Sequence, residues 1–240
     1  MGGGIRAFLA RYFYFAMAVL LAVIVCYGFS HTVEENLFHP SFPRPRVLYV
    51  HAAVFGGWMA LLIAQTGLVA LARRRKWHRW LGWLGVALGL AMPVLGTSSA
   101  LSMTHLRYGF GDIDDVAFLI LALNDMAAFA ALFAAAILLR NRDGEAHKRL
   151  ILMATCLIVV AALTRFPPWL PAPEHGVWPY YLYADLLVGL GLLRDLVVLR
   201  RPHWVYTRVF PAVALLQAIA NTVYMTRPAP YMALMLKLVG

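Results

Sequence analysis

The sequence contains little charge and almost no cysteine. Only 13% of its 240 residues are charged and 62% are hydrophobic, whereas soluble proteins have about 25% charged and roughly 45–50% apolar residues. This composition excludes a soluble α/β enzyme and a disordered regulatory chain. The two cysteines, Cys26 and Cys156, form no CxxC or Cys/His pattern, which excludes a disulfide scaffold and a thiolate metal centre. What remains is the composition of an integral membrane protein.

Motifs of several enzyme classes are also missing. The chain has no GxxxxGK(S/T), HExxH or GxSxG motif, and it lacks the HxxxH and HxxHH clusters of membrane di-iron enzymes. Its only lysines are Lys76, Lys148 and Lys237. None of them falls inside an apolar run, which excludes a retinal Schiff base.

Apolar runs, by contrast, are long and frequent. Crossing about 30 Å of hydrocarbon takes roughly 20 helical residues, and seven runs approach or exceed that length. The predicted spans are residues 12–30, 47–72, 81–104, 116–139, 150–170, 178–199 and 204–226. Their connections are short, apart from the proline-rich loops 31–46 and 165–177, which we expect to cap the outer mouth. We predict an all-α integral membrane protein, with one seven-helix bundle over residues 1–240.

The basic residues are divided unequally between the two sides that these spans define. Fifteen lie on the side of the amino terminus: Arg6, Arg11, Arg73, Arg74, Arg75, Lys76, Arg79, Arg140, Arg142, Lys148, Arg149, Arg194, Arg200, Arg201 and Arg208. Six lie on the other: Arg44, Arg46, Arg107, Arg165, Arg227 and Lys237. The positive-inside rule therefore predicts a cytoplasmic amino terminus and an outer carboxyl terminus, in a bacterial cytoplasmic membrane. The net charge of +10 indicates orientation and contact with anionic lipid, and not a nucleic-acid partner.

The eight histidines fall into two layers in this topology. The inner layer is His78, His147 and His203, and the outer layer is His31, His39, His51, His105 and His175. His78 and His147 each open a helix beside basic residues. Two imidazoles from facing helices are the ligands of six-coordinate b-type haem, and the nearby cations suit its propionates. The alternative is anchoring at the lipid headgroups, together with Trp77, Trp80 and Trp83.

A second set of candidates lies in the outer half. His51, Trp58 and Gln65 recur every seven residues, which places them on one stripe facing the bundle. His51 with His105 would form a second haem site. Alternatively, His31, His51 and His105 would bind Zn, Cu or Fe, with the site completed by Asp112, Asp114 and Asp115. The structural alternative for His51 is a hydrogen-bonded core histidine.

Two carboxylates are expected inside the bundle. Asp125 lies near the middle of its span and Asp185 about a third of the way into its own. An unpaired carboxylate there is costly, so Asp125 is a candidate catalytic group that handles protons or binds a quinol. The alternative is a polar lock with Gln217 and Asn221, and Arg165 could neutralise Asp185. Arg194-Asp195 we interpret as a local structural feature.

These motifs resemble those of a bacterial family of predicted membrane proteins of unknown function. The shared features are the His in the second helix (His51), the H-R-x-L-G turn that begins at His78, and the turn that begins at His147, which reads H-K-R here. The helix after that turn ends in Thr164-Arg165, as in the family. The resemblance covers about residues 47–166 and implies a multi-helix membrane fold. Histidines on the third and fifth helices near one face are also similar to the cytochrome b561 pattern.

Two classes of function follow. The first is a membrane redox or electron-transfer protein that binds haem b and exchanges electrons with quinone or another membrane subunit. The second is a protein without redox chemistry: a transporter or metal-binding sensor that uses the outer His/Asp cluster, or an accessory subunit of a larger complex.

Overall fold

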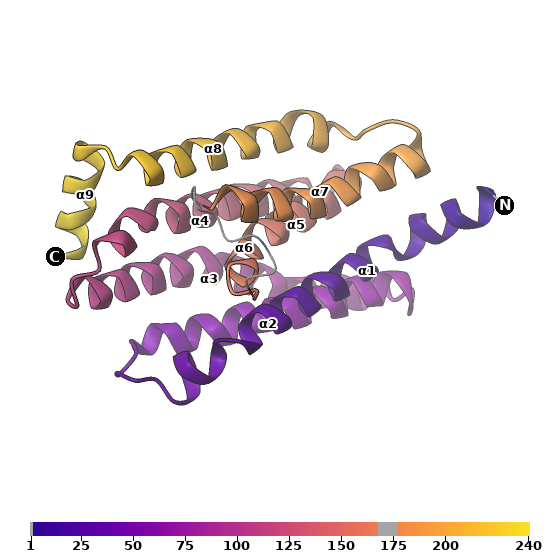
Figure 1. The fold of residues 1–240 in the computed structure, drawn as a ribbon. Helices are drawn as coiled ribbons and strands as arrows, with labels where there is room; N and C mark the ends of the chain where they lie inside the picture. Colours follow the sequence, from indigo (N-terminus) through magenta and orange to yellow (C-terminus); the bar gives the residue numbers. More distant parts are fainter. Residues whose placement is uncertain (1, 168–176) are drawn as a thin grey trace.

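The computed structural model describes residues 2–167 and 177–240, and no strand occurs among them (Figure 1). His175 and most of the proline-rich loop 165–177 lie outside the described residues. The helices are α1 (Gly2–Ser30), η1 (Glu34–Phe38), α2 (Arg46–Ala70), α3 (Arg75–Tyr108), α4 (Ile113–Leu139), α5 (Gly144–Ile158), α6 (Val160–Leu163), α7 (Trp178–Leu199), η2 (Val205–Val209), α8 (Phe210–Thr226) and α9 (Ala229–Val239).

Six of the described helical segments are long and apolar enough to cross a membrane, which confirms a multi-helix membrane protein. They are residues 4–30, 46–70, 75–108, 113–139, 144–163 and 205–226. Helix α7 has 22 residues but does not belong to this group. It carries three charged side chains, those of Asp185, Arg194 and Asp195.

Local signals fix where several helices begin and end. The Asp112 carboxylate accepts the Asp115 backbone N–H at 3.0 Å and begins α4. The Asp143 carboxylate accepts the Ala146 N–H at 2.9 Å and begins α5. Both side chains satisfy a donor that the first helical turn leaves free. Because Asp143 caps it, α5 begins six residues before the predicted apolar span. Its continuation α6 ends at Leu163, seven residues before the predicted end.

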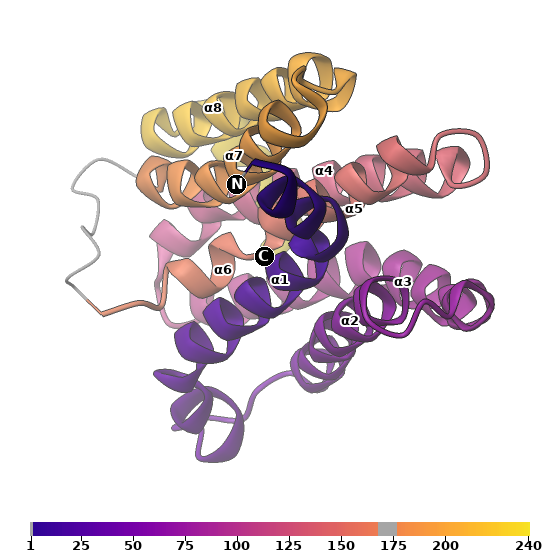
Figure 2. The ribbon, with the colours of Figure 1, turned by 90° about the vertical axis from the view of Figure 1, so that its right-hand side faces the viewer.

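Consecutive long helices lie side by side, and α4 and α5 form the most buried part of the bundle (Figures 1 and 2). Two glycines permit close packing between elements. A Cβ at Gly89 of α3 would overlap the Phe133 ring of α4, and a Cβ at Gly28 of α1 would overlap the Ala162 backbone in α6. Small residues at helix contacts are typical of membrane bundles.

Helix α9 was not predicted from the sequence. Its 11 residues cover only about 16 Å, too short to cross a bilayer. The Tyr231 hydroxyl anchors it, because it donates to the Ala117 carbonyl oxygen at 3.0 Å and accepts the Ile120 N–H at 3.0 Å. Helix α9 therefore packs against the first part of α4.

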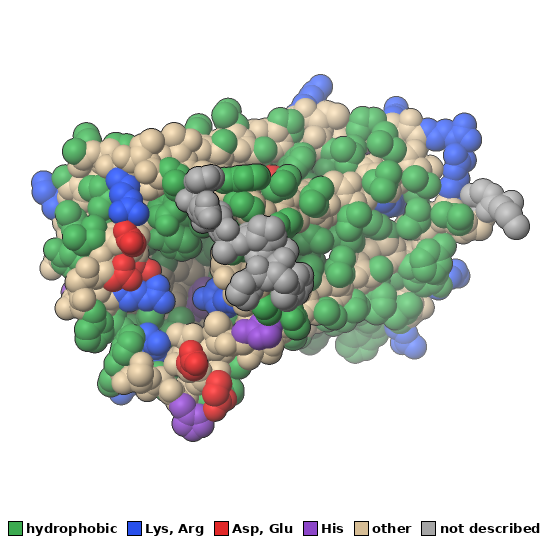
Figure 3. All heavy atoms as spheres, in the orientation of Figure 1, with side chains coloured by type: hydrophobic (Ala, Val, Ile, Leu, Met, Phe, Trp, Pro, Cys, Tyr) green, Lys and Arg blue, Asp and Glu red, His purple; other side chains and the backbone are tan. Residues whose placement is uncertain are grey.

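The surface agrees with contact to a lipid bilayer. Hydrophobic side chains cover most of the face in Figure 3, and charged side chains gather mainly at its two ends. Large apolar residues such as Trp80, Leu90 and Val94 of α3 are more than 60% exposed. In water such a surface would be costly, whereas in hydrocarbon it is expected.

Candidate functional site

The two inner histidines, His78 and His147, have the same hydrogen-bond arrangement. The Nδ1 atom of His78 in α3 lies 3.3 Å from the Gln65 carbonyl oxygen of α2. The Nδ1 atom of His147 in α5 lies 2.9 Å from the Ala136 carbonyl oxygen of α4. A carbonyl oxygen can only accept, so Nδ1 carries the proton in both neutral rings. This leaves Nε2 of each ring free as a ligand, the arrangement common among metal-bound histidines.

The two rings also have similar surroundings. Both are half-buried, and the imidazoles of His78 and His147 are within electrostatic range of each other. They come from helices that are not consecutive, and each is held by a carbonyl near the end of a neighbouring helix. Four helices, α2 to α5, therefore contribute to this place. It lies at the end of the bundle that carries the arginine-containing turns 71–74 and 140–143, which we call the basic end.

Polar groups surround the inner pair. The Gln65 side-chain oxygen is buried without a hydrogen-bond partner. Its amide nitrogen is 3.7 Å from where a Cβ at Gly82 would lie, one turn after His78. The Arg140 guanidinium sits 5.0 Å from the centre of the Trp83 ring and is within electrostatic range of His147. Two free imidazole nitrogens and a nearby cation would fit a group that binds two imidazoles and carries carboxylates, whereas the unpartnered Gln65 oxygen needs a hydrogen-bond donor.

His203, the third inner histidine, is arranged differently. Its Nδ1 accepts the Val205 backbone N–H at 3.4 Å, so its proton is on Nε2, which lies 3.9 Å from an Asp143 carboxylate oxygen. Burial lowers the pKa of His203 below its ordinary value. The Ala146 N–H that Asp143 caps, together with the Trp204 indole N–H at 3.3 Å, holds the pKa of Asp143 below its ordinary value. His203 is therefore not equivalent to His78 and His147.

His51 and His105 are not brought together. His51 stacks on Phe55 at 4.0 Å, has no partner at Nδ1, and lies beside the Leu95 backbone of α3. His105 lies ten residues further along α3, or about 15 Å along the helix axis. The Nδ1 atom of His105 bonds to the Val239 carbonyl oxygen at the end of α9. The structure therefore gives no support to the predicted second haem pair.

His105 lines a small groove instead. This groove of about 390 Å³ is bordered by Pro45, Leu101, Ser102, His105, Leu106 and Leu238. Neither His31 nor His51 contributes to it. His31 packs edge-on against Tyr27 of α1, with 4.8 Å between the ring centres.

The predicted outer metal site is not formed either. Within residues 2–167 and 177–240, no three His, Cys, Asp or Glu side chains lie close enough together to hold a metal ion. The acidic residues that would complete the site have other partners. Asp112 caps α4, Asp115 pairs with Arg107 at 2.5 Å and Asp114 pairs with Arg227 at 2.7 Å. The pairs of Asp115 and Asp114 join the start of α4 to the ends of α3 and α8.

Asp125 belongs to a polar contact inside the bundle. The Tyr181 hydroxyl of α7 donates to its carboxylate at 3.0 Å, and the Asn124 amide lies 3.4 Å away. One turn later in α7, Asp185 accepts the Gln217 amide of α8 at 3.3 Å. Helix α7 is thus joined to α4 and to α8 through carboxylates. The expected lock through Gln217 is present.

Two expected partners of this lock act elsewhere. The Asn221 side-chain oxygen accepts the Val177 backbone N–H at 3.1 Å, at the start of α7. Arg165 bonds to the Ala161 carbonyl oxygen and lies over the Phe29 ring at 4.5 Å. It forms no ion pair with Asp185 or any other described carboxylate.

A chain of ion pairs at the basic end was missed from the sequence. Lys148 pairs with Glu145 at 2.5 Å, Glu145 with Arg149 at 2.7 Å, Arg149 with Asp195 at 2.6 Å, and Asp195 with Arg194 at 2.9 Å. The side chains of Arg149 and Asp195 are completely buried. Arg194-Asp195 is therefore not a local feature of α7, because it joins α7 to α5. The signal in the sequence was the charge itself, since a charge inside an apolar helix needs a partner.

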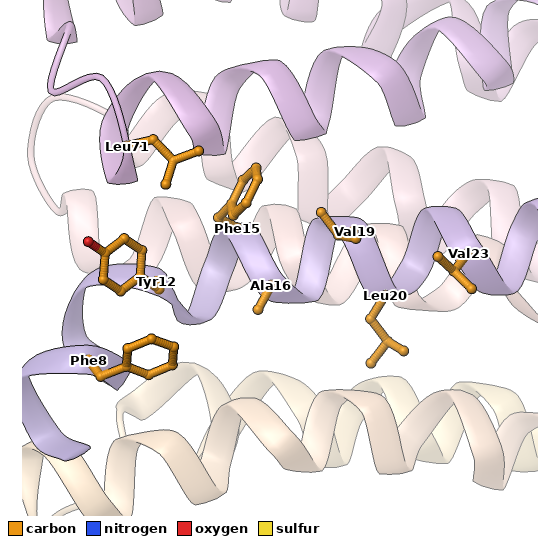
Figure 4. Close-up of a pocket in the computed structure, with 8 residues that line it drawn as sticks. All are labelled: Phe8, Tyr12, Phe15, Ala16, Val19, Leu20, Val23 and Leu71. Carbon is orange, nitrogen blue, oxygen red and sulfur yellow. The ribbon is translucent and has the colours of Figure 1, made fainter.

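An apolar groove lies on a different face of the bundle. About 580 Å³ in volume, it follows α1 and reaches the end of α2 (Figure 4). It is bordered by Phe8, Tyr12, Phe15, Ala16, Val19, Leu20, Val23 and Leu71. None of the candidate ligands borders it, and its lining matches a surface that faces lipid chains.

No protein-family model matches the chain, and no curated protein or solved structure matches it either. The resemblance to the family of uncharacterised membrane proteins therefore stays a prediction from the motifs.

Proposed function

We propose that this protein is a membrane electron-transfer protein that binds haem b through His78 and His147. The observation that carries the proposal is the shared state of these two side chains. In each ring the Nδ1–H donates to a main-chain carbonyl oxygen and Nε2 is free, and the two rings lie within electrostatic range. The same pair in a merely anchoring role would not need matched tautomers.

Each part of the proposed site has a separate task. The Gln65 and Ala136 carbonyls fix the orientation of the two rings. Arg140 lies near His147, where it would neutralise a propionate. The bound haem would supply one-electron exchange. The contact between Asp125 and Tyr181 would hold a proton inside the bundle or bind the hydroxyl of a quinol.

The proposal includes the finer topology. With α7 as a seventh span, the amino terminus is cytoplasmic, the carboxyl terminus is outside, and the haem lies near the cytoplasmic face of a bacterial inner membrane. The charges of α7 do not oppose this, because Asp185, Arg194 and Asp195 all have partners. Membership in the uncharacterised family would fit the same description.

The test is an absorption spectrum of the detergent-purified protein, expressed with haem available, first oxidised by air and then reduced by dithionite. We expect a Soret band that shifts on reduction, together with sharp α and β bands. His78→Ala and His147→Ala should each abolish the low-spin spectrum, because each removes an axial ligand.

The matched control is His203→Ala, which removes an inner histidine with the opposite tautomer. His51→Ala should also leave the spectrum unchanged. A featureless spectrum from folded wild-type protein would refute the proposal and favour an accessory or transport role. Loss of the bands in His51→Ala, with retention in His147→Ala, would place the site in the outer half instead.

A further inference from the structure

The ion-pair chain at the basic end carries an unbalanced charge. Its five members, Lys148, Glu145, Arg149, Asp195 and Arg194, alternate in sign and begin and end with a cation. Three cations face two carboxylates, so the chain has a net charge of +1. At the Arg194 end of this ion-pair chain, the Arg194 side chain is 4% exposed and the Asp195 side chain is not exposed. The buried members alone, Arg149, Asp195 and Arg194, are two cations and one carboxylate, and a buried charge without compensation is costly.

The same place holds hydrogen-bond donors without partners. Six buried side-chain polar atoms lack a partner among the described residues, and three of them are here: the Tyr14 hydroxyl, the Tyr206 hydroxyl and Nε of Arg194. Tyr206 and Arg194 are each only 4% exposed. All three groups can donate a hydrogen bond. Buried donors normally have acceptors, so the cluster lacks an acceptor.

These donors converge from three elements. Tyr14 in α1 lies beneath two cations, with Lys148 Nζ at 5.0 Å and the Arg194 guanidinium at 5.6 Å from its ring centre. A Cβ at Gly191 would overlap the Tyr206 hydroxyl, so this hydroxyl contacts α7 one turn before Arg194. The Tyr14 and Tyr206 hydroxyls are within electrostatic range of each other and of Arg149 and Asp195.

We propose that this cluster binds a phosphate group, held by the Tyr14 and Tyr206 hydroxyls and the Arg194 guanidinium. A water molecule would satisfy some of the donors but would leave the charge of +1, whereas a phosphodiester monoanion compensates it. The two oxygens of a carboxylate lie in one plane, whereas the tetrahedral oxygens of phosphate can accept from donors on three different elements. Arginine also matches the geometry of phosphate oxygens. Lys148 and Glu145, with 29% and 53% of their side chains exposed, connect the cluster to the surface.

The phosphate group has two sources, the headgroup of an anionic lipid or free phosphate. In the first arm of the test, delipidated protein in detergent is titrated with inorganic phosphate at constant ionic strength, and the thermal unfolding midpoint is followed. We expect saturable stabilisation of the wild type. Tyr14→Phe and Tyr206→Phe should each raise the half-saturating phosphate concentration about tenfold. This is the loss of affinity expected for one hydrogen bond to a charged group.

The control is Tyr12→Phe, two residues away on nearly the opposite side of α1, where Tyr12 lines the apolar groove (Figure 4). This variant should respond to phosphate as the wild type does. Arg194→Gln provides a second test that does not depend on the tyrosines. It reduces the net charge of the chain to zero and should abolish the stabilisation.

In the second arm, protein is reconstituted in nanodiscs of phosphatidylglycerol or phosphatidylcholine and examined by native mass spectrometry. Retention of phosphatidylglycerol by the wild type, and its loss in the Tyr14→Phe/Tyr206→Phe double variant, identifies a lipid headgroup. Stabilisation by phosphate without lipid retention identifies the free ion. Equal responses of wild type and double variant in both arms would overturn the proposal and assign the donors to water.

Discussion

Arg149 makes the largest set of side-chain contacts to charged groups at the basic end. Its buried guanidinium donates to both carboxylate oxygens of Asp195 and to the backbone and side-chain oxygens of Glu145. Arg149→Met would leave Asp195 buried with Arg194 as its remaining ionic partner. Because Asp195 loses two hydrogen bonds but keeps one ionic partner, we expect the free energy of unfolding, measured by titration with sodium dodecyl sulfate, to fall by about 2–3 kcal/mol.

The comparison for this variant is Arg142→Met. Arg142 is exposed in the turn between α4 and α5, so its loss should change the free energy of unfolding by less than about 0.5 kcal/mol. Similar small losses in both variants would show that the ion-pair chain does not hold α5 to α7.

At the scale of elements, the contact between α1 and α6 depends on one glycine. A Cβ at Gly28 would overlap the Ala162 carbonyl group, and a backbone group in a packed helix moves less readily than a side chain. Gly28→Ala should therefore lower the free energy of unfolding by about 1–3 kcal/mol. Gly56→Ala is the matched control, because nothing lies within 4 Å of its added Cβ. A loss in Gly56→Ala equal to that in Gly28→Ala would contradict this account of the contact.

The sequence predicted most of the long helices but fewer of their ends. Apolar runs report the part of a helix that lies in hydrocarbon, so the predicted span 81–104 lies inside the longer helix α3 (Arg75–Tyr108). The start of α5 depends on the cap at Asp143, a local signal outside the apolar run. Helix α9 is shorter than a span, and its anchor at Tyr231 is a tertiary contact.

The sequence could predict which candidate side chains lie together only where they begin or end helices at the same end of the bundle. His78 and His147 open helices at the same end of the bundle, and the structure places them within electrostatic range. A shared haem site would require His51 and His105 to lie at the same depth in the bundle. His51 lies beside Leu95, and His105 is about 15 Å further along the axis of α3, so the two side chains do not meet. The ion-pair chain joins residues 46 positions apart. No spacing rule within one helix reports such a contact.

At the scale of the whole molecule, the side of the membrane on which the last loops lie depends on whether α7 crosses the bilayer. Asp195 lies near the end of α7 and pairs with Arg149 near the start of α5, so these two ends share one side of the membrane. Asp114 and Arg227 likewise place the start of α4 beside the end of α8. If α7 crosses the bilayer, residue 201 is cytoplasmic and residue 229 is outside. If it does not, both positions change sides.

Single cysteines therefore test the proposed topology in a Cys26→Ser/Cys156→Ala background. We expect a membrane-impermeant maleimide to label Asn141→Cys and Arg201→Cys only in inside-out vesicles, and Glu35→Cys and Ala229→Cys only in right-side-out vesicles. All four positions are exposed, so accessibility reports the side of the membrane and not burial. Labelling of residues 201 and 229 from the reversed sides, with residues 35 and 141 as expected, would show that α7 does not cross. The ion pair between Asp195 and Arg149 of α5 would then be incompatible with the bundle, because α5 begins on the side of residue 141.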